Sequence, residues 1–189
     1  MTLPGVVGRI GLVRPGSRLQ VREMQLAEVG IRIDYFHGAS DEQLRKLGVE
    51  RGLLPSHQAW RQWYEADYAR PIQQRENFSL LWLVDDQIVG FSSTDQIRFG
   101  EQAFMHLHIV EPARRRAGLG AQFVRLSAAA YFQALHLQRL YCQPNSFNTA
   151  PNRTLQSAGF HYLFTAELAP SPINFVQPVT RWVLQQPPP

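Results

Sequence analysis

The chain has 189 residues, of which 44% are hydrophobic, 18% charged and 11% aromatic. This length suffices for one sizeable core and is short for two, and the apolar fraction excludes wholesale disorder or a fibrous chain. The single cysteine, Cys142, excludes an internal disulfide and is compatible with the cytoplasmic location that we expect.

The net charge of +4 comes almost wholly from arginine, because Lys46 is the only lysine among 19 basic residues. An arginine-rich nucleic-acid binder is a disfavoured alternative, since no aromatic-basic stacking motif accompanies the charge. No window approaches the roughly 18 to 20 uninterrupted apolar residues of a membrane span. We therefore expect neither a membrane segment nor a nucleic-acid partner.

Residues 1–20 are basic, without an acidic residue, and are interrupted by prolines and glycines. They are typical of an extension, and their composition disfavours an organellar presequence. We expect one domain over residues 21–186, followed by a proline tail over 187–189.

Two helix starts can be recognised early in this domain. Ser40 precedes acidic residues and Gly48 follows as a stop, which predicts a short helix between them. A second helix is predicted to begin at Ser56. Its aromatic residues recur at helical spacing, a pattern that favours the core but is also compatible with an acceptor pocket. They are Trp60, Trp63, Tyr64 and Tyr68.

From residue 79 the pattern changes to short strands. Residues 79–84 and 88–93 form a predicted hairpin through Asp85, Asp86 and Gln87. The elements predicted after it are a strand (103–110), a helix (118–137), a strand (140–143), a helix ending at Gly159, and strands near 160–167 and 179–184. This order predicts an α/β fold with a mixed, mostly antiparallel twisted sheet flanked by helices.

The segment IVEPARRRAGLGAQF, residues 109–123, joins a strand to a helix through a glycine-containing loop. Glycines let backbone amides approach a ligand, and a helix start favours an anion, so the segment suits a pyrophosphate. A Walker loop is excluded because no lysine is present, and a dinucleotide fingerprint lacks its third glycine and later acid.

The pattern Val110-x-Pro112-x-x-Arg115-x-x-Gly118-x-Gly120 resembles the acyl-coenzyme A loop of the GNAT superfamily of N-acetyltransferases. About 30 residues later, an asparagine, a helix and Gly159-Phe160 resemble that family's second signature. The order of elements from Phe78 to Phe164 is also similar.

The resemblance implies a GNAT-like fold in which backbone amides of residues 116–121 hold the pyrophosphate of acetyl-CoA. The pantetheine arm would lie between two diverging strands, against main-chain atoms of the 104–110 strand. The residues implied in binding the coenzyme are His108, Ile109, Val110, Arg115, Arg116, Ala117, Gly118, Leu119, Gly120, Ala121, Asn148 and Asn152.

Acyl transfer to an amine requires a proton acceptor and stabilisation of the departing thiolate. The period of two in the 104–110 strand puts His106 and His108 on one face, and either imidazole is a candidate base. A purely structural pair is the alternative, and a metal site lacks a convincing third ligand. The family's usual tyrosine acid is replaced by Leu155, which leaves Tyr141 as the candidate acid, with Cys142, Ser146 and Tyr162 as substitutes.

We expect the acceptor pocket to be built by residues 34–68 and 170–178, with Asp34, Tyr35 and His37 as candidate contacts. The resemblance implies transfer of an acetyl group from acetyl-CoA to a primary amine, of a small molecule or a protein N-terminus, by direct attack. A non-catalytic acyl-CoA-binding sensor is the alternative because of Leu155. A homodimer remains open, and no metal is expected.

Overall fold

The computed structural model describes residues 16–110 and 119–186. They form a seven-stranded sheet of order β1-β2-β3-β4-β5-β7-β6. Only β4 and β5 pair in parallel, which confirms the predicted mixed and mostly antiparallel sheet. The strands are β1 (Leu19–Glu23), β2 (Phe78–Val84), β3 (Gln87–Arg98), β4 (Gln102–Ile109), β5 (Arg139–Cys142), β6 (His161–Leu168) and β7 (Gln177–Gln185).

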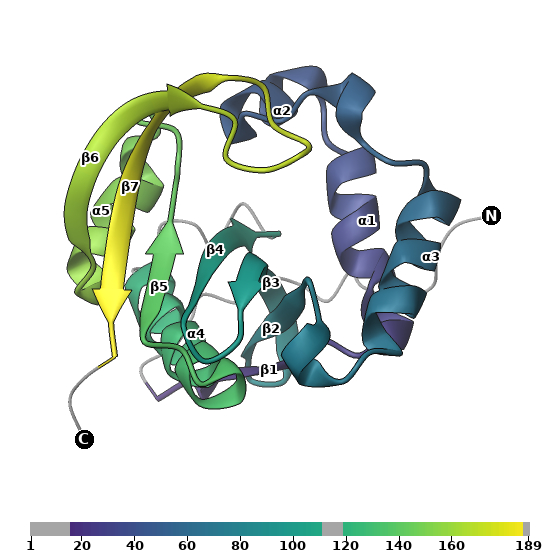
Figure 1. Cartoon of the computed structure of the whole chain (residues 1–189), viewed down its shortest axis with the longest axis horizontal. Helices are drawn as coiled ribbons and strands as arrows, with labels where there is room; N and C mark the ends of the chain where they lie inside the picture. The colour runs from purple at the N-terminus through teal and green to yellow at the C-terminus, as the bar shows by residue number, and fades with distance from the viewer. Residues whose placement is uncertain (1–15, 111–118, 187–189) are drawn as a thin grey trace.

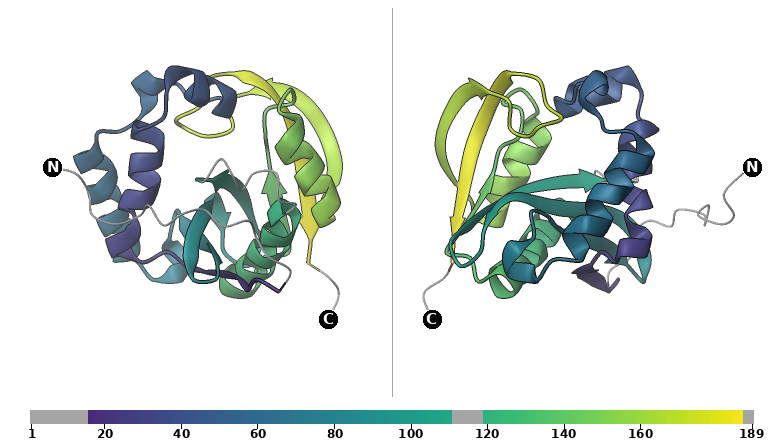
Figure 2. Two further views of the ribbon diagram at one scale, coloured as in Figure 1. Left: turned by 180° about the vertical axis from the view of Figure 1, so that it is seen from behind. Right: turned by 45° about the vertical axis from the view of Figure 1, so that its right-hand side comes forward.

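Helices cover both faces of this sheet (Figures 1 and 2). One face packs against α4 and α5, and the N-terminal half of the other face packs against α1 and α3. The helices are α1 (Gly30–His37), α2 (Asp41–Leu47), α3 (His57–Tyr68), α4 (Leu119–Leu135) and α5 (Thr149–Ala158), with short 3₁₀ turns η1 (Leu26–Glu28), η2 (Arg51–Leu53) and η3 (Ile72–Gln74). No helix in the described ranges is long and apolar enough to cross a membrane.

The predicted helix boundaries are confirmed where a cap marks them. The Ser40 and Ser56 side chains accept hydrogen bonds from the backbone N–H groups of Gln43 and Ala59, each 3.2 Å long. Gly48 and Gly159 end their helices in the left-handed conformation, with φ of 70° and 98°.

Several boundaries differ from those predicted. Helix α4 ends at Leu135 rather than 137 because His136 has a left-handed φ of 52°. Strand β3 continues to Arg98 rather than ending at 93, since β4 pairs with it along this length. Strand β1 is not among the predicted strands, and it begins at Leu19, which is in register with Val84.

Strand β2 lies at the centre of the core and is buried along its whole length. Leu80 and Trp82 face α4, where the Trp82 ring stacks on Phe123 with centroids 5.0 Å apart. Leu81 and Leu83 face the α1 and α3 side. Because both faces of the strand are covered, its apolar run is continuous rather than alternating.

The loop between β6 and β7, residues 169–176, reaches across to the end of α2 (Figure 1). The Gly48 carbonyl accepts hydrogen bonds from Asn174 Nδ2 at 2.8 Å and from Gln177 Nε2 at 3.0 Å. The Glu50 N–H donates to the Ile173 carbonyl at 2.9 Å. These bonds tie the C-terminal part of the sheet to the N-terminal helices.

Candidate active site

A cavity of about 740 Å³ lies where these parts meet. Its walls come from α1 and α3, from β3 and β4, from Cys142 at the end of β5 and residues 143–145 after it, and from the 169–176 loop. The 170–174 part of that loop therefore lines a pocket, as do residues within 34–68. Trp60 and Tyr64 are buried, and Trp60 and Trp63 line the cavity, so the aromatic stripe of α3 serves both the core and the pocket.

The cavity passes through the point where β4 and β5 separate. Their parallel pairing covers four positions, from Gln102 with Arg139 to Met105 with Cys142, but β4 continues to Ile109. After β5 the chain continues through Pro144, which has no N–H to donate, and its carbonyl accepts from Thr180 N on β7 at 3.0 Å. Backbone groups of β4 beyond Met105 therefore adjoin a space in which an extended, amide-bearing molecule fits.

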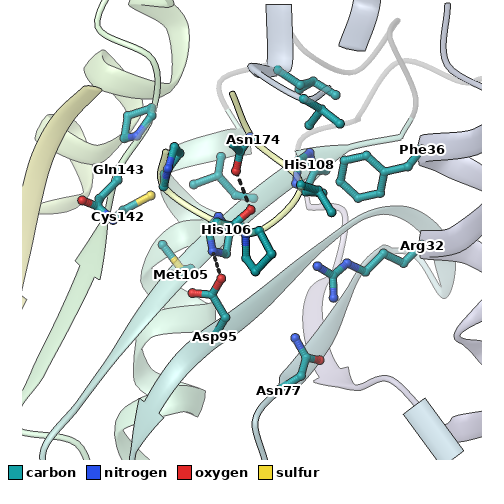
Figure 3. Close-up of a pocket in the computed structure, with 18 of the residues that line it drawn as sticks. Arg32, Phe36, Asn77, Asp95, Met105, His106, His108, Cys142, Gln143 and Asn174 are labelled. Atoms are coloured by element: carbon teal, nitrogen blue, oxygen red, sulfur yellow. Dashed lines mark hydrogen bonds and ion pairs between the residues drawn. The ribbon is translucent and has the colours of Figure 1, made fainter. Parts of the chain in front are cut away.

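His106 and His108 both line the cavity from β4 (Figure 3). The Nε2 atom of His106 lies 3.0 Å from Oδ2 of Asp95, and both side chains are about one quarter exposed, at 22% and 27%. The pair forms an ion pair when the imidazole is protonated. This is the arrangement expected of a base with a carboxylate beside it.

His108 has a different environment. Its ring is packed among Tyr35, Phe36 and Phe91, with centroid distances of 5.2, 5.1 and 5.0 Å. These contacts fix the ring at the junction between α1 and the sheet.

The candidate acceptor contacts Asp34, Tyr35 and His37 are on α1 but do not line the cavity; Arg32 and Phe36 of the same helix do. Asp34 Oδ1 lies 3.6 Å from His57 Nε2 on the outer side, where both side chains are about 60% exposed. His37 stacks on His57, and its Nε2 lies 3.0 Å from the Pro55 carbonyl.

The candidate acid Tyr141 is likewise absent from the cavity wall. Its ring stacks on Phe104 with centroids 5.0 Å apart. The neighbouring Cys142 does line the cavity and is 4% exposed. Burial raises the pKa of the Cys142 thiol to about 12, so the thiol is neutral at physiological pH.

The predicted coenzyme contacts divide into three groups. Arg115, Arg116, Ala117 and Gly118 lie outside the described residues. The second group lies where β4 continues beyond its pairing with β5, and it comprises His108, Ile109 and, directly after the strand, Val110. The Val110 N–H donates to the Val89 carbonyl at 3.0 Å.

The remaining candidates lie on α4, on α5 and at Asn148, the residue just before α5. Leu119 is buried and Ala121 packs against the same core. A Cβ atom on Gly120 would lie 3.2 Å from Thr154 Cγ2, so this glycine permits close packing of the two helices. The Asn152 amide donates to the carbonyls of Asn145 and Asn148 and accepts from Trp182 Nε1 at 2.8 Å, a structural role, whereas Asn148 lines the cavity.

Two cavity residues, Asp95 and Arg32, are not predicted from the sequence. Asp95 lies beyond the predicted end of its strand, and only the β3–β4 register brings it next to His106. Arg32 lies on α1, which begins without a side-chain cap and gives little sequence signal. The alternating residue pattern of the second hairpin strand continues past residue 93, and following it would have placed Asp95 on that strand.

Comparison with known proteins places this geometry in context. The family model described as an acetyltransferase (GNAT) domain matches residues 18–161. No curated protein matches by sequence.

Solved structures match over nearly the whole chain. The ribosomal L7/L12 alpha-N-protein acetyltransferase RimL, in complex with coenzyme A, has a TM-score of 0.69 at 12% identity, covering 93% of this chain and 98% of its own. The aminoglycoside acetyltransferase AAC(6')-Ib, with coenzyme A and kanamycin, gives 0.67 at 12% identity, covering 89% and 95%. Spermidine N-acetyltransferase from Vibrio cholerae gives 0.65 at 13% identity, covering 89% and 94%.

At these identities the structural matches establish the fold, and the family model, which spans more than half of the chain, establishes the family. The predicted GNAT-like fold is confirmed. The chain belongs to the GNAT family of acetyl-CoA-dependent acetyltransferases.

Proposed function

We propose that the protein transfers the acetyl group of acetyl-CoA to a primary amine by direct attack, with His106 as the base. The observation that carries this proposal is the His106–Asp95 pair in the wall of a cavity that reaches the separation of β4 and β5. An amine acceptor is further supported by two similar structures, which are named as an alpha-N-protein acetyltransferase and a spermidine N-acetyltransferase.

In this mechanism acetyl-CoA is a substrate whose pantetheine arm lies along β4 beyond Met105. The amine enters from the side of α1 and α3, which contribute Phe36, Trp60 and Trp63 to the cavity. Such a placement brings the amine and the thioester together at the β4 edge, and positioning of this kind contributes much of the rate in bimolecular reactions.

The reaction itself requires one proton acceptor. The amine nitrogen bonds to the acetyl carbon, the carbonyl becomes a tetrahedral oxyanion, and His106 takes the proton that the nitrogen must lose. Because Nε2 lies 3.0 Å from Asp95 Oδ2, we assign Nδ1 as the imidazole nitrogen that accepts this proton, with the Asp95 carboxylate stabilising the imidazolium. The carbon–sulfur bond then breaks, and solvent protonates the departing thiolate. Tyr141 has no part in this mechanism, because it does not line the cavity.

The test is acetyl transfer by the full chain. The protein is mixed with acetyl-CoA and a panel of small amines and short peptides, and both thiol release and product mass are measured. We expect thiol release that depends on the amine and matches the acetylated product in amount. Tight binding of acetyl-CoA without transfer to any amine would contradict the proposal and indicate a sensor.

A further inference from the structure

Arg32 is a charged residue of the cavity wall that has no role in the proposed mechanism. It lies on α1, and its Nη1 donates a hydrogen bond to the Tyr64 hydroxyl of α3. Its Cζ atom lies 5.6 Å from the centre of the Trp60 ring and 5.9 Å from that of Tyr64. The guanidinium is thus held against aromatic rings, which restrains its orientation.

The guanidinium points into the cavity from the side opposite His106 and Asp95 (Figure 3). Its Nε atom is buried and makes no hydrogen bond with any part of the chain that the structure describes. Within residues 16–110 and 119–186, no carboxylate forms an ion pair with Arg32, whereas other arginines of this half, such as Arg22 and Arg75, have one.

Two other charged residues of the cavity wall have partners of opposite charge, because Glu76 is paired with Arg70 and Lys46 with Glu42. The Asp95 carboxylate lies beside His106, on the other side of the cavity. Arg32 is therefore a cation of this wall that has no carboxylate partner within residues 16–110 and 119–186. A partly buried cation without a counter-charge is costly, and a ligand anion that pairs with it recovers that cost.

We propose that the acceptor is an amine that also carries an anionic oxygen group, a carboxylate or a phosphate, and that Arg32 binds this group. The inference rests on the proposed function, whose acceptor class it specifies. Arginine presents a planar fork that suits either group. Phe36, Trp60 and Trp63 add apolar surface beside Arg32, which favours an acceptor with an apolar or aromatic part.

The same charge disfavours polycationic acceptors. Spermidine and an aminoglycoside would bring further positive charge next to Arg32, and the Glu76 carboxylate of the wall is already paired with Arg70. The acceptor of this chain therefore differs in charge from those named for two structures with the same fold.

The first experiment compares amines that differ only in the anion. The pairs are tryptophan with tryptamine, phenylalanine with phenethylamine, and phosphoethanolamine with ethanolamine, and spermidine is added as a polycation. We expect the anionic member of at least one pair to have a kcat/KM higher by about tenfold to a hundredfold, as for one charge-assisted hydrogen-bonded contact. The first two pairs report a carboxylate and the third a phosphate. Equal rates within every pair, or a preference for spermidine, would overturn the inference.

The second experiment tests whether Arg32 is the source of the preference. Arg32→Gln is expected to reduce the rate ratio within the preferred pair to near one, and Arg32→Lys to retain part of it. Arg61→Gln is the matched control, because Arg61 is on α3, is half exposed and pairs with Glu65 outside the cavity. Thermal melting and the affinity for coenzyme A establish that each variant is folded. An unchanged ratio in folded Arg32→Gln would remove the role of this residue.

Failure of this inference can be told apart from failure of the proposed function. Transfer to amines with no anion preference would leave the acetyltransferase activity intact and remove only the inference. If no amine is acetylated, calorimetry with each pair in the presence of coenzyme A still decides, because anion binding does not require turnover. Equal affinities for both members, or no binding of any anionic member, would then overturn the inference.

Discussion

The imidazole of His106 and the carboxylate of Asp95 meet diagonally across the β3–β4 pair, with Nε2 and Oδ2 3.0 Å apart. In the register of the two strands, His106 is opposite Ser93 and Asp95 is opposite Phe104. The regular register ends after Asp95 and resumes at Arg98. Side chains on one face at such diagonal positions are within reach of each other, so the sheet itself positions the carboxylate beside the base.

Replacing His106 tests the proposed base. His106→Ala is expected to lower kcat by about 10²- to 10⁴-fold, the usual contribution of general base catalysis. The affinity for coenzyme A should be little changed, because the proposed coenzyme contacts on β4 are main-chain atoms. His161→Ala is the control, since His161 is exposed on β6 and outside the cavity. Full activity in His106→Ala would make this histidine structural.

Asp95→Asn tests whether the carboxylate acts through His106. The amide keeps the shape but removes the negative charge that stabilises the imidazolium, so we expect kcat to fall, and by less than in His106→Ala. The double variant His106→Ala/Asp95→Asn should be no slower than His106→Ala alone, because Asp95 has no route to the reaction without the histidine. Additive losses would assign Asp95 a separate role.

The helix ends can be predicted from the sequence where a capping residue sets them. Ser40, Ser56, Gly48 and Gly159 define helix ends through caps that act within a few residues, and all four boundaries are confirmed. Helix α1 has no such mark: its N-terminal residue follows Val29, which makes no side-chain cap. Because the sequence does not predict α1, it also does not show which face of that helix points toward the cavity.

The site is less predictable for the same physical reason. Residue type favours Asp34, Tyr35 and His37, yet helical geometry turns Arg32 and Phe36, four residues apart, toward the cavity. The pairing of Asp95 with His106 depends on strand register across a turn, which a motif does not encode. The sequence does predict that His106 and His108 share one face, because an alternating strand pattern assigns faces directly.

Cys142 tests direct transfer against an acyl-cysteine route. Because burial raises the pKa of its thiol to about 12, we expect slow alkylation by iodoacetamide at pH 8 in the folded protein and fast alkylation in denaturant. Cys142→Ala should keep kcat within about twofold, since no acyl group passes through the thiol. An acetylated Cys142 trapped by rapid quenching and mass spectrometry would contradict direct transfer.

The same burial predicts a loss of stability in alkali. The thiol of the unfolded chain ionises near its ordinary pKa of about 8.5, whereas the folded thiol keeps its proton up to a pKa of about 12. Above pH 8.5 the unfolded state therefore binds fewer protons than the folded state, and the free energy of unfolding falls as the pH rises. Denaturant melts from pH 8 to 10.5 should show a shallower decline in Cys142→Ala than in the unmodified chain. Parallel declines would contradict this assignment.

Gly48 tests the tie between α2 and the 169–176 loop. Its φ of 70° is strained for other residues, and an added Cβ atom would overlap the buried side-chain amide of Gln177. Gly48→Ala is therefore expected to cost about 2 kcal/mol or more, because a left-handed backbone alone costs about 1–2 kcal/mol. Gly52→Ala is the control, since nothing lies within 4 Å of a Cβ atom there. Equal melting temperatures for the two variants would show that this tie does not stabilise the fold.

The last prediction concerns a polar network inside the main core. Trp82 Nε1 donates to the Ser127 hydroxyl at 2.8 Å, and Ser92 bridges Ser127 and Tyr131 at 3.2 and 2.8 Å. All four residues are fully buried. Ser127→Ala removes the acceptor of the Trp82 N–H and leaves that group unsatisfied at this position.

An unsatisfied buried donor costs about 1–3 kcal/mol, so the free energy of unfolding of Ser127→Ala should fall by that amount. Ser157→Ala, at an exposed position on α5, should change it by no more than about 0.5 kcal/mol. Urea melts of both variants make the comparison, and near-UV circular dichroism reports whether the Trp82 environment changes. A Ser127→Ala variant as stable as Ser157→Ala would mean that the core relaxes to give the indole another partner, and the Trp82–Phe123 stack would then shift with it.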